Sequence, residues 1–263
     1  MRFVLILVLS LSFGGASAQV SQLLKDAENG DAEAMLELSE KYLFGLGVNK
    51  SDDSSKYWAD QALATGDMKA QYLVGVLNTS AAFDKKKFGK GVDLLKLSAE
   101  QGFPDASLKL SEIYRTRGTG MATDAFYDLK QSFSYGEVAA KAGEKEAMYY
   151  CGESLIKGRG CSRNDSLGVY YISEAATTKG YIPACLRMGD LHMSGHITGE
   201  IDPFGALEWY NYVLNHRRSN IDQRATAQLG IHAVDNLVRQ WQNLIFQAGG
   251  VMPQNTFDYN IRE

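Results

Sequence analysis

The stretch that decides the fold is residues 30–62, which read GDAEAMLELSEKYLFGLGVNKSDDSSKYWADQA. Ala34, Leu38 and Tyr42 are four residues apart, which is the spacing of one face of a helix. A Gly-x-Gly turn at residues 45–47 interrupts this pattern, and a second helical pattern of apolar residues follows it. The stretch therefore predicts two helices joined by a glycine-bearing turn.

The same unit recurs along the chain, marked by a small residue followed four positions later by Ala. The marker pairs are Gly30/Ala34, Gly66/Ala70, Gly102/Ala106, Gly143/Ala147, Gly180/Ala184 and, in a degenerate sixth copy, Ile221/Ala225. Their spacings of 36, 36, 41, 37 and 41 residues are typical of helix-pair solenoids. Another small residue follows each Ala by five positions, where we expect two helices to approach closely. These residues are Ser39, Gly75, Ser111, Gly152, Gly189 and Gly230.

Composition supports an all-α class for this 263-residue chain, which is 45% apolar and has only four prolines. We expect one solenoid over residues 19–248, with repeats near 30–65, 66–101, 102–142, 143–179 and 180–220 and a degenerate cap at 221–248. Second helices are expected near residues 54–64, 91–100, 125–142, 166–178 and 204–215. The formal charge of −4 offers no basic field for nucleic acid, and the run Lys85–Lys87 is predicted to be a solvated turn.

The two ends of the repeat array require capping, because a helical stack exposes apolar faces at its termini. Residues 20–28 are predicted to form a helix that covers the first copy. Residues 222–247 are predicted to form one continuous helix that closes the array with one apolar face. The residues of that face are Leu229, Ala233, Leu237, Trp241 and Leu244. Residues 249–263 show no period and are predicted to be a tail.

The first 18 residues have the composition of a secretory signal peptide. Arg2 is followed by the apolar stretch 3–13 and by the small residues Ala16, Ser17 and Ala18, after which we expect cleavage. That stretch is too short to span a bilayer, and no other segment is longer, so we expect no membrane span in the mature chain. The predicted location is the periplasm or the extracellular space.

These features resemble the Sel-one-like repeat, a relative of the tetratricopeptide repeat. The resemblance rests on residues 30–34, Leu38, Tyr42, the 45–48 turn and Tyr57-Trp58, and extends over roughly residues 20–235. It implies a right-handed α/α solenoid of about six helix pairs that binds proteins or peptides on a concave face. First helices line that face in such solenoids, so the resemblance points to eight binding residues. They are Glu37, Lys41, Lys109, Glu112, Tyr149, Tyr150, Arg187 and His192. The alternative for Tyr149 and Tyr150 is packing between helices.

The three cysteines would meet an oxidising compartment if the chain is exported. Cys151 and Cys161 occupy the repeat positions of Leu38 and Val48, two core positions of one copy, which favours a disulfide between them; two buried thiols are the alternative. Cys185 is predicted to be a buried spare thiol.

Two side-chain pairs have the spacing of functional sites but lack the other residues that such sites require. His192 and His196 have a metal-binding spacing but no suitable third ligand nearby except Asp190, so no metal site is expected. Ser154 and Lys157 have the spacing found in penicillin-recognising enzymes, but the companion motifs are absent from the sequence. We therefore expect no cofactor and no enzymatic activity.

The sequence thus favours a secreted or periplasmic scaffold or adaptor that mediates protein–protein interaction. A binder of cell-wall material or a weak β-lactamase-like hydrolase is the alternative, supported only by Ser154 and Lys157. A third possibility is a eukaryotic secretory adaptor, because Asn78 and Asn164 lie in glycosylation motifs.

Overall fold

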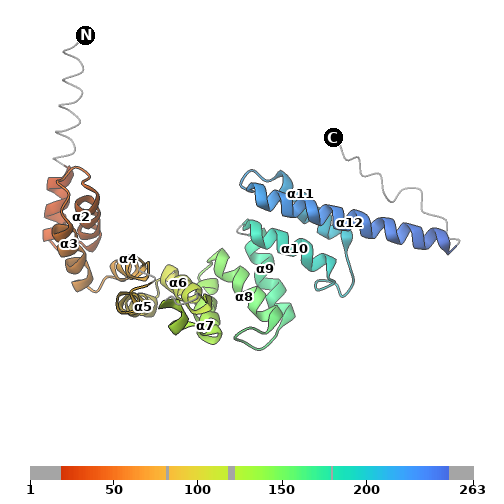
Figure 1. Ribbon diagram of the computed structural model, residues 1–263, viewed down its shortest axis with the longest axis horizontal. Coiled ribbons are helices and arrows are strands. Elements are labelled where there is room, and N and C mark those ends of the chain that lie inside the picture. The colour runs from red at the N-terminus through yellow and green to blue at the C-terminus, as the bar shows by residue number, and fades with distance from the viewer. Residues whose placement is uncertain (1–18, 81–82, 118–121, 179, 249–263) are drawn as a thin grey trace, which may run out of the picture. The chain divides into compact units, whose positions relative to one another are not determined.

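The computed structural model describes residues 19–80, 83–117, 122–178 and 180–248, and within these ranges the chain forms helices and no strand. The predicted signal peptide and the predicted tail lie outside the described residues. The chain divides after Glu144 into two compact units, which are considered separately. In each unit the helices pack as antiparallel pairs (Figure 1).

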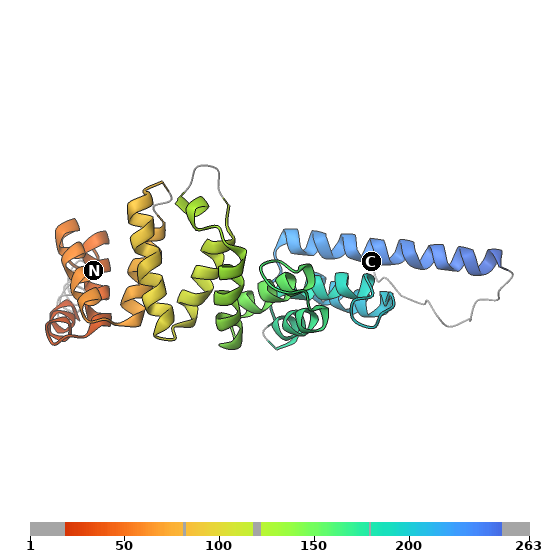
Figure 2. The ribbon, with the colours of Figure 1, turned by 90° about the horizontal axis from the view of Figure 1, so that it is seen from below.

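Unit 1 contains the first three helix pairs, preceded by a helix that includes residues 19–28. Its elements are α2 (Ala32–Phe44), α3 (Asp52–Ala64), α4 (Met68–Thr79), α5 (Lys85–Glu100), α6 (Pro104–Arg115), the 3-10 helix η1 (Ala122–Phe126) and α7 (Leu129–Lys141). Each first helix packs most extensively on the second helix of its own copy, as Figure 2 shows for α4 with α5. The predicted helix-pair repeat is confirmed.

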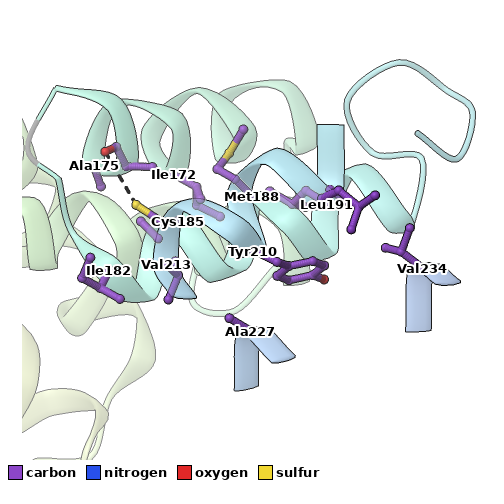
Figure 3. Packing of buried hydrophobic residues seen from close by; sticks show 14 of the residues in the cluster. Ile172, Ala175, Ile182, Cys185, Met188, Leu191, Tyr210, Val213, Ala227 and Val234 are labelled. Carbon is purple, nitrogen blue, oxygen red and sulfur yellow. Dashed lines mark hydrogen bonds between the residues drawn. The ribbon is translucent and has the colours of Figure 1, made fainter. Parts of the chain in front are cut away.

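Unit 2 contains the next two pairs and a long final helix. Its elements are α8 (Lys145–Lys157), α9 (Asp165–Thr177), α10 (Ile182–Met193), α11 (Pro203–Asn215) and α12 (Ile221–Gln247). The buried cluster of this unit joins α9, α10, α11 and α12 around Ile172, Leu191 and Val213, each of which is 0% exposed (Figure 3).

The marker residues explain where each first helix begins. Gly30 has a φ of 96°, a left-handed conformation that a glycine adopts without strain, and Asp31 then accepts hydrogen bonds from the backbone N–H groups of Glu33 and Ala34. Ala34 is 5% exposed, and the equivalent alanines of the next four copies are 0–1% exposed. The marker glycine forms the turn before the helix, and the marker alanine four residues later is buried in the core. Each copy needs both residues, which is why the pair recurs in the sequence.

In the first four copies, the small residue five positions after the marker alanine lies where the two helices of the copy cross. Ser39 Oγ is 3.2 Å from Ser55 Oγ in the first copy. A Cβ added to Gly152 would lie 2.7 Å from the carbonyl oxygen of Gly168 and 2.5 Å from Ile172 Cγ1. The close approach predicted from the sequence is therefore confirmed in the first four copies, where the partner is a second small residue, sixteen positions later in three of them. Gly189 and Gly230 instead meet the ring of Tyr210.

Two second helices, α5 and α7, begin at other residues than predicted, because an aspartate caps the N-terminus of each. Asp84 accepts a hydrogen bond from the backbone N–H of Lys87, so the predicted solvated turn Lys85–Lys87 is the first turn of α5. Asp128 caps Lys130 and Gln131, so α7 begins at Leu129 rather than near residue 125, and the preceding residues form η1.

The last helix forms as predicted, but the predicted packed face is wrong. Ala227 and Val234 are 0% exposed and face the Tyr210 side of the cluster (Figure 3), with Ile231 and Val238 packed beside them. By contrast, Leu229 is 72% exposed. The reason is Gly230, which rests against the ring of Tyr210 and turns the 227–231–234–238 stripe toward α10 and α11.

Candidate functional site

A groove of about 810 Å³ lies between the first and second helix pairs of unit 1. Its apolar wall comes from both pairs and consists of Leu43, Ala59, Leu63, Val74, Leu77, Leu94 and Leu97. Leu77 and Leu97 are 57% and 47% exposed, so this apolar surface is open to solvent. The volume is within the range of small-ligand and peptide pockets.

The groove exists because unit 1 has two separate hydrophobic clusters rather than one. Leu38 and Ala62 belong to the first cluster, with the first helix pair. Leu95 and Leu110 belong to the second, which α4, α5 and α6 share. The α2–α3 pair packs only lightly on α4, and Leu77 and Leu97 between the two pairs remain about half exposed.

Charged side chains surround the apolar wall. The lysines are Lys56, Lys86, Lys87 and Lys90, and the aspartates are Asp52, Asp60, Asp84 and Asp93. Asp84 is engaged in capping α5. None of the four lysines has an ion-pair partner among the residues that the structure describes, so their ammonium groups can bind acidic groups of a ligand.

A smaller hollow of about 470 Å³ adjoins the groove and shares Leu43, Ala59 and Leu77 with it. Lys69 and Glu33 line this hollow and form an ion pair from α4 to α2. The two hollows therefore make one continuous surface across the first two copies.

Of the predicted binding residues in unit 1, only Glu37 lines this surface. Glu37 pairs with Lys41 on the same helix at 3.3 Å, and Lys109 pairs with Glu112 at 2.9 Å on α6. Each pair is partly exposed and adds little to stability. The structure does not bring the two pairs together.

In unit 2 the predicted residues Tyr149 and Arg187 meet around a residue that the sequence analysis missed, Glu153. Arg187 Nε lies 2.5 Å from Glu153, which also pairs with Lys157 one turn along α8. The Tyr149 ring packs edge-on against Tyr150 and Tyr181. The i,i+4 spacing of Glu153 and Lys157 was the available signal for this cluster.

The charge of Glu153 is stabilised by its two cations. Burial alone would raise the pKa of its carboxyl group, but hydrogen bonds from Lys157 and Arg187 outweigh burial and lower that pKa. Burial raises the pKa of Tyr149 beside it. The cluster thus joins α8 to α10 by a half-buried ion pair. Arg187 therefore has a structural role between these two helices.

Replacing Glu153 by Gln should lower the free energy of unfolding by about 1–3 kcal/mol near pH 7, because Arg187 would lose its charged partner. Since folding lowers the pKa of Glu153, its contribution is present above the ordinary pKa and is lost as pH falls through the folded value. Urea unfolding should therefore show the two proteins converging in stability as the pH falls below the lowered pKa of Glu153. Glu137→Gln, which removes the exposed pair with Lys141, is the matched control and should cost under about 0.5 kcal/mol.

His192 does not lie with Tyr149 and Arg187 in this cluster. Its Nδ1 is 3.0 Å from Asp202, the residue that caps α11, so His192 joins α10 to the start of α11. His196 Nδ1 is 2.7 Å from Ser194 Oγ instead of sharing a ligand with His192. No metal-binding group of His, Cys, Asp and Glu side chains occurs among the described residues.

The disulfide predicted between Cys151 and Cys161 is not formed in the structure, and the pairing stays a prediction. Cys151 is buried in α8, while Cys161 is half-buried in the following turn, with its Sγ 3.7 Å from the Arg159 carbonyl. Cys185 is 0% exposed, and burial raises its pKa to about 11, which keeps it a thiol.

The hydrolase alternative requires Lys157 to interact with Ser154, but Lys157 interacts with Glu153 instead. The ammonium group of Lys157 forms an ion pair with Glu153, whereas a lysine that activates a serine has to bond to that serine. Among the described helices, none is long and apolar enough to cross a membrane.

The marker turns, the helix pairs and the small-residue crossings define an α/α helical-repeat protein. A family model described as Sel1 repeat matches residues 32–67, 69–103, 145–177 and 182–212, on the first, second, fourth and fifth copies. The chain therefore belongs to the Sel1 repeat family, whose members are generally non-catalytic scaffolds for protein–protein interaction.

One solved structure with a TM-score above 0.5 supports the fold, and two further ones are reported beside it. A Sel1 repeat protein from Oxalobacter formigenes is 21% identical, with a TM-score of 0.60, over 74% of this chain and 78% of that one. A Sel1 repeat protein from Klebsiella pneumoniae is 20% identical, with a TM-score of 0.41, over 83% and 99% of the two chains. A protective antigen of uropathogenic Escherichia coli is 19% identical, with a TM-score of 0.42, over 91% and 61%.

Proposed function

We propose that this protein is a secreted or periplasmic, non-catalytic adaptor that binds a protein partner through the groove of unit 1. The observation that carries the proposal is the open apolar wall, in which Leu77 and Leu97 are about half exposed beside lysines with no ion-pair partner in the described chain. Apolar area surrounded by polar groups is the usual composition of a peptide-binding surface. The signal-peptide features of residues 1–18 support export.

The partner segment that fits this groove is an amphipathic helix with acidic residues beside its apolar stripe. Leu77 and Leu97 come from different helices and present apolar anchors that a helix can contact at positions i, i+3 and i+4. The ammonium groups of Lys86 and Lys90 would pair with carboxylates of the segment.

A photo-crosslinking residue placed at position 77 in exporting cells should capture this partner, and the same residue at position 57 should not. Tyr57 is the matched control because it is 54% exposed in the same unit but outside the groove. With the captured protein purified, Leu77→Asp should weaken binding at least about tenfold, since a buried Leu side chain contributes roughly 1.5–3 kcal/mol. Equal capture at both positions, or unchanged affinity of Leu77→Asp, would reject the groove as the binding site.

A further inference from the structure

The last third of α12 projects beyond the helices on which α12 packs. The helix has 27 residues against 12 and 13 in α10 and α11, which corresponds to about 40 Å against about 20 Å. Val238 is the last residue of α12 that packs on the buried cluster of unit 2, and Figure 2 shows the helix running on past its neighbours. Residues 239–247 therefore form a projecting end of about 14 Å.

Three consecutive large apolar residues surround this projecting end. Leu244, Ile245 and Phe246 are 62%, 41% and 79% exposed. Because successive helical residues differ in direction by about 100°, the three side chains point to three sides of the helix. Residues 240–247 contain no charged side chain, whereas a solvent-exposed helix ordinarily carries a charged face. A protein groove or a second helix would cover one side of such an end, but a lipid bilayer surrounds an inserted end on every side.

The residues before these three follow the polarity gradient of a membrane surface. Arg239 is exposed and is the last charged residue of α12. Trp241 is 38% exposed, and tryptophan is enriched at the boundary between lipid headgroups and acyl chains. Along the helix axis Arg239 is about 10 Å from Phe246, which is about the depth to which interfacial helices are buried. Arg239 would then lie at the level of the lipid phosphates, which a guanidinium group binds well.

We propose that residues 241–246, the α12 tip, insert into the surface of a lipid bilayer. Leu244, Ile245 and Phe246 lie below the headgroups, and Trp241 lies among them. Insertion stops at the hydrated interface, where water still reaches the last backbone carbonyl groups of the helix. The contact is mainly apolar, so it does not require anionic lipids, and a few buried side chains make it reversible. This surface belongs to unit 2 and does not depend on the groove of unit 1.

The purified, exported protein should float with phosphatidylcholine vesicles in a density gradient, and high salt should leave the bound fraction nearly unchanged, because apolar contacts are not screened. Phe246→Ser should weaken binding to the vesicles at least about tenfold, the usual loss for one buried aromatic side chain. Leu229→Ser is the matched control and should bind normally, since Leu229 is 72% exposed on the same helix but lies in the part that packs on α10 and α11. No flotation of the unmodified protein, flotation abolished by salt, or normal flotation of Phe246→Ser would overturn the proposal.

The fluorescence of Trp241 tests whether the tip itself enters the bilayer. Of the three tryptophans, Trp58 and Trp209 pack against buried clusters, so a change on adding vesicles should come from Trp241. Its emission should shift to shorter wavelength and be quenched by lipids brominated near the headgroup, and Trp241→Phe should show neither effect. Unchanged emission in vesicle-bound protein would assign the binding to another surface. Capture of a protein in place of lipid by a photo-crosslinker at position 246 would also overturn the proposal.

Discussion

Gly152→Ala is expected to destabilise unit 2 by about 1–3 kcal/mol, the usual cost of overpacking a close contact. The added Cβ would lie 2.5 Å from Ile172 Cγ1 and 2.7 Å from the carbonyl oxygen of Gly168. A side chain could move away, but the backbone oxygen can yield only if α8 and α9 separate. Because each repeat is stabilised by its neighbours, amide exchange should accelerate in α8 and α9 first.

Gly89→Ala is the matched control for this prediction. Gly89 also lies within a helix, α5, but an added Cβ would meet no heavy atom within 4 Å. Replacing an unconstrained helical glycine by alanine should stabilise the chain by about 0.4–1 kcal/mol. Urea unfolding followed by hydrogen exchange would compare the two variants. A Gly152→Ala protein as stable as the Gly89→Ala protein would mean that α8 and α9 cross at a larger distance than described.

The crossings could be predicted from the sequence because they depend on short-range spacing. A marker glycine, an alanine four residues later and a small residue five further on are all set by the geometry of one helix pair. The first residues of α5 and α7 were harder to predict from the sequence, because any of several polar residues can cap a helix. In the folded chain Asp84 and Asp128 are the residues that do so.

The packed face of α12 could not be decided from its sequence, because two apolar stripes run along the same helix. Leu229 and Val234 are equally suitable core residues by type, yet only Val234 is buried. The choice between the stripes depends on Tyr210, which lies on another helix and accommodates Gly230. The groove was missed for a similar reason. It depends on how the first copy packs on the second, and no residue pattern within either copy reports that distance.

Tyr210→Ala should have the largest effect of any single change in unit 2, about 3–5 kcal/mol. Tyr210 is 4% exposed, and its ring lies between Gly189 of α10 and Gly230 of α12. Its hydroxyl group donates a hydrogen bond to Asp190 at 2.8 Å, and burial together with this carboxylate raises the pKa of Tyr210. Loss of the ring would leave a cavity that both glycines border and that no side chain of theirs can fill.

The same substitution should release α12 before it unfolds the rest of the unit, because among the described helices none follows α12 and packs on it. Hydrogen exchange should then rise over residues 221–238, while α8 and α9 remain protected. Tyr210→Phe keeps the ring and removes only the hydroxyl group, so it should cost about 1 kcal/mol and leave α12 protected. Unchanged protection of α12 in Tyr210→Ala would show that the 227–231–234–238 stripe holds the helix without the tyrosine.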